Sequence, residues 1–108
     1  MTSTYDYSVC QVIKKNNELM SEILRDEYGT NLNIESVWNE WEAIEKHEIR
    51  RGDVMFFGFD FPCELYVGIS QSNEKFIHFT KYGMTESSLK NDGWGYRLIG
   101  TRRATQSK

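Results

Sequence analysis

The sequence predicts an α+β domain in which two helices precede an antiparallel sheet. Apolar residues recur at helical spacing through the first 44 positions. After Asp53 the pattern changes to short apolar runs separated by turn residues, which is typical of strands. The chain has 108 residues, of which 14% are aromatic and 27% charged, so it can bury one core and is not of the disordered class. Helices and strands that are segregated along the chain indicate α+β architecture.

Two amphipathic segments predict the helices. Residues 8–28 carry apolar side chains on one face, and Gly29 suits the end of such a helix. A second helical pattern runs from Ile34 to Ile44, with Asn33 as its N-cap. Its other face is acidic, with Glu35, Glu40, Glu42 and Glu45.

The second half of the chain predicts four or five strands. They are expected at 54–57, 65–70, 75–80, 84–89 and 96–104. The turn residues 71–74 join two of these strands into a hairpin, and Gly93-Trp94-Gly95 is expected to be a loop. We interpret residues 1–108 as a single domain with loose tails at 1–6 and 105–108.

Composition excludes several classes of function. The net charge of -3 with no basic face argues against nucleic-acid binding. No apolar run is long enough for a membrane span, and the N-terminus has no signal-peptide pattern, so the chain is expected to be cytoplasmic on synthesis. Cys10 and Cys63 form no CxxC pair, which argues against a zinc site and a disulfide scaffold. They are predicted to be buried free thiols, and no metal or cofactor is expected.

A series of motifs in the second half resembles a known family. In order they are Gly-Asp-Val-Met-Phe-Phe (52–57), Val-Gly-Ile (67–69), Phe-Ile-His (76–78), Ser-Ser-Leu (87–89) and Gly-Thr-Arg-Arg (100–103). The series resembles the core of the NlpC-type cell-wall cysteine peptidases, which implies a papain-like fold. In that family a catalytic His precedes Val-Gly-Ile, and a second polar residue, often His, follows twelve positions later. The corresponding residues here are Tyr66 and His78.

The resemblance also places the nucleophile. A papain-like thiol begins a helix, where the helix N-terminus and a neighbouring imidazolium lower its pKa. The family carries this thiol in Asp-Cys-Ser-Gly, and the matching segment here is Asp6-Tyr7-Ser8-Val9. A phenol titrates near pH 10, so Tyr66 cannot replace an imidazole as general base. The resemblance therefore implies a degenerate site of Tyr7, Tyr66 and His78 with no catalytic residue, so the chain is expected to be a pseudoenzyme.

Two alternatives stay open. Cys10 lies one helical turn beyond Tyr7, and with His78 as its base it would make an active cysteine peptidase or acyltransferase on cell-wall peptides. A thiol at that depth gains less from the helix N-terminus. Cys63, on the Pro62 loop, is nearer the place of the base than that of the nucleophile. The other alternative is a free-standing binder of cell-wall peptides through the degenerate cleft.

The family also suggests partners. Its members act on peptidoglycan stem peptides, and they occur as exported bacterial enzymes and as parts of bacteriophage tails. Without a signal peptide, the resemblance favours a phage or prophage tail-tip component, a virion protein within a larger assembly. We predict that Trp94, Tyr96 and Tyr82, together with the acidic helix 35–45, contact protein partners. Trp94 has a second interpretation as a core anchor.

Overall fold

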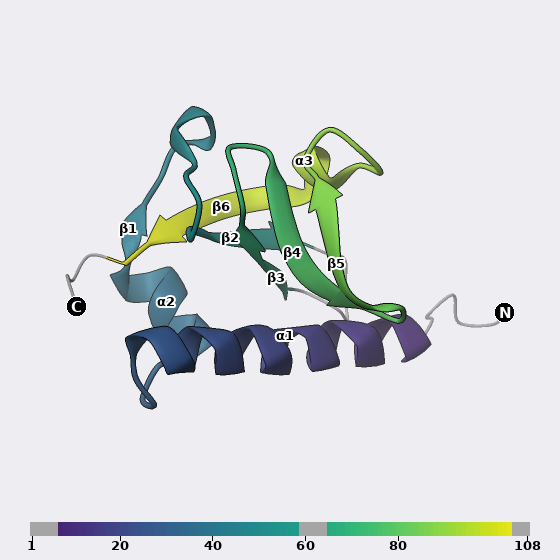
Figure 1. The fold of residues 1–108 in the computed structure, drawn as a ribbon, viewed down its shortest axis with the longest axis horizontal. Helices are drawn as coiled ribbons and strands as arrows, with labels where there is room; N and C mark the ends of the chain where they lie inside the picture. The colour runs from purple at the N-terminus through teal and green to yellow at the C-terminus, as the bar shows by residue number, and fades with distance from the viewer. Residues whose placement is uncertain (1–6, 59–64, 105–108) are drawn as a thin grey trace, which may run out of the picture.

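The protein folds into a six-stranded antiparallel sheet with two helices on one side (Figure 1). The computed structural model describes residues 7–58 and 65–104, and for residues 7–9 it describes the backbone alone. The expected loose tails 1–6 and 105–108 lie outside the described residues. Among the described helices, none is long and apolar enough to cross a membrane.

The sheet has the strand order β1-β6-β2-β3-β4-β5. In chain order the elements are α1 (Tyr7–Tyr28), α2 (Ile34–Glu40), β1 (Glu42–Ala43), the 3-10 turn η1 (Lys46–Glu48), β2 (Val54–Gly58), β3 (Leu65–Ser70), β4 (Lys75–Thr80), β5 (Gly83–Ser88), α3 (Trp94–Arg97) and β6 (Leu98–Arg103). Helix α1 packs against β3 and β4, and α2 follows beside the end of α1 (Figure 1). The α+β class, the first helix and the 65–80 hairpin are confirmed.

The second helix is shorter than predicted. It begins under an Asn33 cap, whose Oδ1 accepts a hydrogen bond from Ser36 N at 2.9 Å, as expected. It ends at Glu40 instead of Ile44, because Trp41 adopts an extended backbone conformation. The next two residues pair with Arg102 and Arg103 of β6 as strand β1. Tertiary pairing thus overrides the helical spacing of the apolar residues, and the predicted acidic helix 35–45 is divided between a helix, a strand and a turn.

The C-terminal strand also differs from its prediction. It was expected over 96–104, but β6 starts at Leu98. The predicted loop at Gly93-Trp94-Gly95 instead leads into the short helix α3, because Gly93 takes a left-handed conformation with φ 76° and redirects the chain. Gly95 N then donates to Leu89 O at 2.9 Å, which holds α3 at the end of β5. With β1 added, the sheet has six strands instead of four or five.

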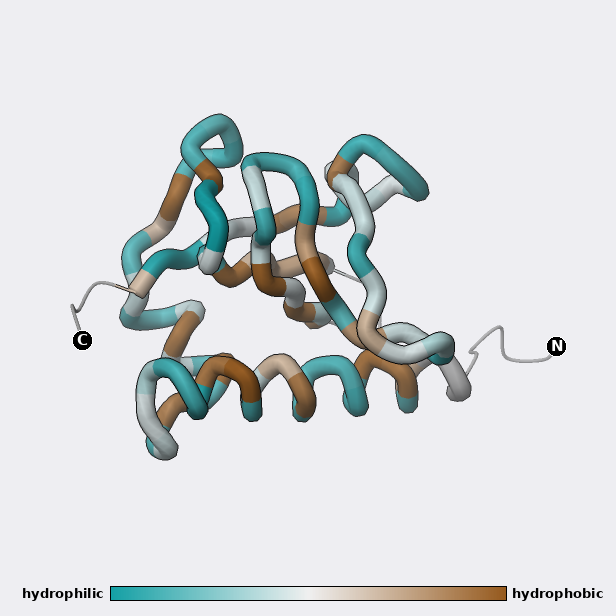
Figure 2. Tube along the Cα trace, viewed as in Figure 1, coloured by the Kyte–Doolittle hydropathy of each residue, from teal (hydrophilic) through white to brown (hydrophobic). Residues whose placement is uncertain are grey.

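Strand β2 is buried on both faces and divides two hydrophobic clusters. Val54 and Phe56 face α1 and α2, whereas Met55 and Phe57 face the other side of the sheet. The helix-side cluster contains Met20, Leu24, Val37, Val54, Phe56, Val67 and Ile69. The other cluster also includes one residue of α1, Ile13, and contains besides it Ile49, Met55, Phe57, Tyr66, Phe76 and Leu89. Figure 2 shows hydrophobic segments along α1 and in the central strands, with hydrophilic loops around them.

Strands β3 and β4 separate, and a side chain from α1 fills the gap. Their ladder pairs only Ile69 with Ile77 and Ser70 with Phe76. Beyond that point the fully buried Asn16 donates from Nδ2 to Val67 O at 2.9 Å. Its Oδ1 accepts from Phe79 N at 2.7 Å. One side-chain amide thus replaces the main-chain hydrogen bonds that the separated strands lack.

Asn17 extends this substitution along β3. Its Nδ2 donates to Leu65 O at 3.0 Å, and its Oδ1 accepts from Val67 N at 3.1 Å. Asparagine is a weak helix former, and two in succession weaken the middle of α1. The hydrogen bonds to β3 and β4 explain why Asn16 and Asn17 stand there.

An ion pair joins the residue before β2 to the last residue of β6. Asp53 is 2% exposed, and Arg103 donates to both of its carboxylate oxygens at 2.8 Å. Arg50 N donates to the same carboxylate at 2.9 Å, and Ser70 N donates to Asp53 O at 2.8 Å. The Gly-Asp and Arg-Arg pieces of the motif series therefore form one structural contact between β2, β3 and β6.

Replacing Asn16 by alanine is expected to destabilise the fold by about 2–4 kcal/mol, because it leaves Val67 O and Phe79 N buried without partners. Urea denaturation monitored by circular dichroism measures the change. The matched control is Asn39→Ala, since Asn39 is exposed on α2 and should cost less than about 1 kcal/mol. Equal losses in the two variants would contradict the bridging role of Asn16.

Candidate functional site

Tyr66 and His78 meet at the gap between β3 and β4, at the two positions that the family resemblance singled out. Tyr66 Oη lies 2.5 Å from His78 Nδ1. The same hydroxyl donates to Phe79 O at 2.6 Å. On the other side of the ring, His78 Nε2 lies 2.7 Å from Ser87 Oγ on β5. The two ring nitrogens of His78 are therefore both engaged.

These contacts allow one consistent placement of protons. A phenol has a single hydroxyl hydrogen, and Tyr66 uses it to donate a hydrogen bond to the Phe79 carbonyl. We therefore assign the ring proton of neutral His78 to Nδ1, which donates to Tyr66 Oη, and let Ser87 donate to Nε2. The hydrogen bonds then run in one direction from Ser87 to a main-chain carbonyl.

Burial keeps both rings of the pair uncharged. His78 is 1% exposed, and burial lowers its pKa to about 4. Tyr66 is 4% exposed, and burial raises the pKa of its phenol above the ordinary value of 10.0. At neutral pH the pair is thus a neutral imidazole and a neutral phenol. It contains no strong base.

Trp94 covers the pair. Its ring stacks on Tyr66 with centroids 5.4 Å apart and an interplanar angle of 28°. It also meets the His78 ring edge-on at 5.0 Å. Phe57 and Phe76 complete the aromatic cluster, and Phe76 lies so close to Gly68 that a Cβ there would approach it to 2.7 Å. Trp94 therefore acts as a core anchor, which agrees with its second interpretation.

The other two predicted binding residues are exposed but far from each other along the sheet. Tyr82 is 85% exposed in the turn between β4 and β5, and Tyr96 is 96% exposed on α3. Helix α3 is held at the far end of β5 by the Gly95–Leu89 hydrogen bond. The six residues of β5 span about 20 Å. Trp94, Tyr96 and Tyr82 therefore do not form one patch on a single copy of the chain.

Comparison with known proteins identifies the family. The sequence model of the NlpC/P60 family matches residues 16–103. The chain belongs to the NlpC/P60 family. A solved structure of a Staphylococcus aureus Mu50 protein, described as similar to lipoprotein, NLP/P60 family, aligns with a TM-score of 0.69 and 20% identity. The alignment covers 98% of this chain and 46% of the Staphylococcus chain, so this chain spans less than half of that protein. None of the curated proteins compared matches the chain.

The nucleophile position is only partly described in this NlpC/P60 domain. Tyr7 begins α1, as the resemblance implied, but its side chain lies outside the described residues. The family match starts at Asn16, so it does not include Tyr7. The convergence of Tyr7 with Tyr66 and His78 stays a prediction.

Cys10 is disulfide-bonded, which corrects the prediction of a free thiol. The sequence has one other cysteine, Cys63, which lies outside the described residues. The error arose because sequence separation says nothing about distance in space, and two cysteines in no motif give no other signal. In this state Cys10 has no thiol to donate, and His78 has no nitrogen left to receive its proton.

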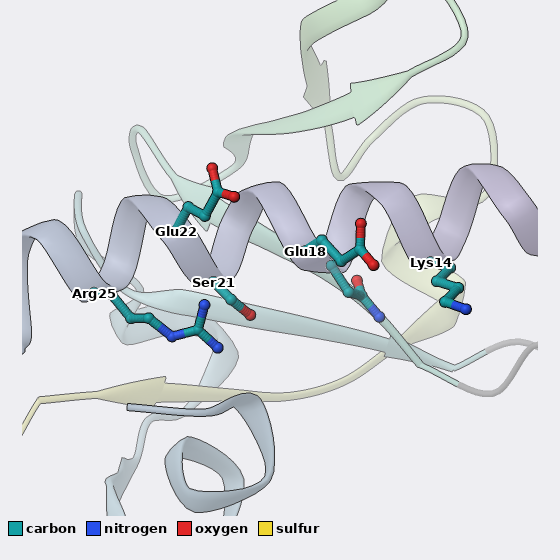
Figure 3. Close-up of a pocket in the computed structure, with 6 residues that line it drawn as sticks. Lys14, Glu18, Ser21, Glu22 and Arg25 are labelled. Carbon is teal, nitrogen blue, oxygen red and sulfur yellow. The ribbon is translucent and has the colours of Figure 1, made fainter. Parts of the chain in front are cut away.

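A groove lies along α1 (Figure 3). Its volume is about 430 Å³, and it is lined by Lys14, Asn17, Glu18, Ser21, Glu22 and Arg25. All of these belong to one helix, so the groove has no opposing wall and exposes charges of both signs. No group of three metal-binding side chains occurs among the described residues.

The sequence interpretation missed several residues that shape the site. Asn16 and Asn17 hold β3 and β4 apart, and Ser87 binds the far nitrogen of His78. An adjacent asparagine pair inside a helix was the available signal, because polar amides in that position need partners. Ser87 stood in the Ser-Ser-Leu motif without an assigned role.

The stability of the domain is expected to fall with acid because of His78. Its folded pKa of about 4 lies below the unfolded value of 6.5, so the unfolded chain binds the proton first. The contribution of neutral His78 to the free energy of unfolding is complete above pH 6.5. It is lost as the pH falls from 6.5 to 4, and the loss is about 3 kcal/mol. Urea denaturation at several pH values measures this slope.

His78→Gln should flatten the slope in that window relative to the native chain. His47→Gln is the control, because the His47 side chain is 79% exposed, and it should leave the slope unchanged. If the native chain and both variants lose the same stability between pH 6.5 and 4, the assignment of a neutral, buried His78 is wrong.

Proposed function

We propose that this NlpC/P60 domain is catalytically inactive and acts as a structural or binding module. One observation carries the proposal. The position that the family uses for its general base holds Tyr66, and the Tyr66 hydroxyl is bound between His78 and the Phe79 carbonyl. The residue is therefore part of a closed hydrogen-bond network and not a group that can accept a proton.

The chemistry of the family supports the same conclusion. Acyl transfer to a thiol needs an imidazole that removes the thiol proton and later protonates the leaving group. The raised pKa of Tyr66 keeps its phenol protonated, and a neutral phenol donates hydrogen bonds but accepts protons poorly. Trp94 lies against both rings and occupies space above them. A disulfide at Cys10 removes the alternative nucleophile.

The module is proposed to serve in a protein assembly, with a phage tail tip as the context that the family suggests. The exposed tyrosines Tyr82 and Tyr96 offer aromatic contact area. Four exposed acids, Glu35, Glu40, Glu42 and Glu45, lie along α2, β1 and the start of η1. They suit a partner with a basic surface.

The native protein is expected to release no peptide from soluble peptidoglycan fragments at pH 7, as measured by mass spectrometry of the products. A Tyr66→Phe variant should behave the same, because the phenol takes no part in catalysis. Cleavage that is lost on His78→Ala would overturn the proposal and favour an active cysteine hydrolase.

A thiol-directed electrophile tests the Cys10 alternative separately. The native chain is expected to react slowly or not at all at pH 7 without a reductant. Fast labelling of Cys10, abolished by His78→Ala, would show a working dyad. Isothermal titration with the same fragments covers the binding alternative, and saturable binding without cleavage would make cell-wall peptide recognition the function of the module.

A further inference from the structure

Strand β5 leaves one long side of the sheet open. It pairs with β4 at all six positions from Gly83 to Ser88 without a register shift. Its other side has no strand beside it in the part of the chain that the structure describes. The opposite edge strand, β1, has only two residues. The sheet therefore has one edge long enough to bind another strand.

This edge carries little of the usual protection. Edge strands normally carry lysine, proline or a bulge, which prevent further pairing. Within β5 the only charged residue is Glu86, and there is no proline or lysine. Met84 is 49% exposed on the same strand. An extended backbone is the partner whose donors and acceptors match such an edge.

We propose that two copies of this chain join through their β5 strands, antiparallel about a two-fold axis at Thr85. The pairing would continue the sheet from one copy into the other, with six strands from each. The interface would be isologous, with the same strand on both sides. The inference goes beyond the loss of hydrolysis and is tested independently of it.

Backbone geometry limits the possible registers. In an antiparallel pair, opposed residues must both turn their main-chain groups toward the partner strand or both away from it. For a strand that pairs with its own copy, the axis must then pass through a residue and not between two. An axis at Glu86 would place two carboxylates directly opposite, which is unfavourable. An axis at Met84 would pair only Gly83–Thr85 within the strand and extend into the turn.

An axis at Thr85 passes through a residue and keeps the two Glu86 carboxylates from facing each other. It pairs Gly83 with Ser87 and Met84 with Glu86, while Thr85 meets its own copy. Opposed threonines are a favourable cross-strand pair, and Glu86 meets the apolar Met84 instead of another acid. Five residues from each copy take part.

The same axis explains the positions of the exposed tyrosines. Tyr82 precedes β5, and Tyr96 lies on α3 at its other end. Antiparallel pairing brings the first end of one strand beside the second end of its copy. Tyr82 of each copy therefore lies near α3 of the other copy. Two exposed rings that are separated within one chain become neighbours across the interface.

Sedimentation velocity over a wide concentration range tests the pairing. The native chain is expected to show a monomer–dimer equilibrium. Met84→Glu would put two pairs of opposed carboxylates into the dimer and should weaken dimerisation roughly tenfold. Met84→Lys would face Glu86 of the other copy and should strengthen it several-fold. The double variant Met84→Glu, Glu86→Lys should restore native association.

Ile99→Glu is the matched control, since Ile99 is 52% exposed on β6, away from β5, and should leave association unchanged. Thermal melting confirms that every variant is folded. A native chain that stays monomeric at all concentrations overturns the proposal. So does a dimer that responds equally to the Met84 and Ile99 changes, because another surface would then hold it together.

Discussion

The two hydrogen bonds of Asn16 decide the shape of the site. Without them, β3 and β4 would have to continue their ladder toward Tyr66 and Phe79 to satisfy the same main-chain groups. The amide allows the strands to separate while no buried donor or acceptor loses its partner. The space that opens is where the Tyr66 hydroxyl reaches both His78 and the Phe79 carbonyl. Asn16, a residue of α1, thus maintains the separation of β3 and β4 in which Tyr66 and His78 meet.

The Tyr66–His78 pair carries no charge at neutral pH. An imidazole can exchange a proton near neutral pH, whereas the phenol of Tyr66 keeps its proton and donates a hydrogen bond to the Phe79 carbonyl. Ser87 and Tyr66 bind the two nitrogens of His78, and Trp94 lies against its ring. These contacts pack the imidazole into a partly polar core.

Local patterns predicted the parts of the fold that local forces determine. The apolar face of α1 and the turn between β3 and β4 are both visible in sequence periodicity. The predicted end of α2 was wrong. Trp41 continues the helical pattern of apolar residues, but the two residues after it pair with β6, more than fifty residues away. The family resemblance placed Tyr66 and His78 together, but their contact could not be derived from hairpin geometry, because the β3–β4 ladder stops at Ile69 and Ile77. The disulfide at Cys10 and the position of Trp94 depend on long-range packing, which no local pattern encodes.

The ion pair of Asp53 and Arg103 links residues fifty positions apart, and this has a consequence for the order of folding. Strand β2 lies in the middle of the sheet, yet one of its two neighbours is β6, which a ribosome would make only after every other strand. Until then the Asp53 carboxylate lacks its cation, and β2 has an open side. The nascent domain can form its helices and the β3–β4 hairpin early, but it completes its central sheet only when β6 arrives. During that interval the side of β2 that later receives β6 is a surface that a chaperone can recognise.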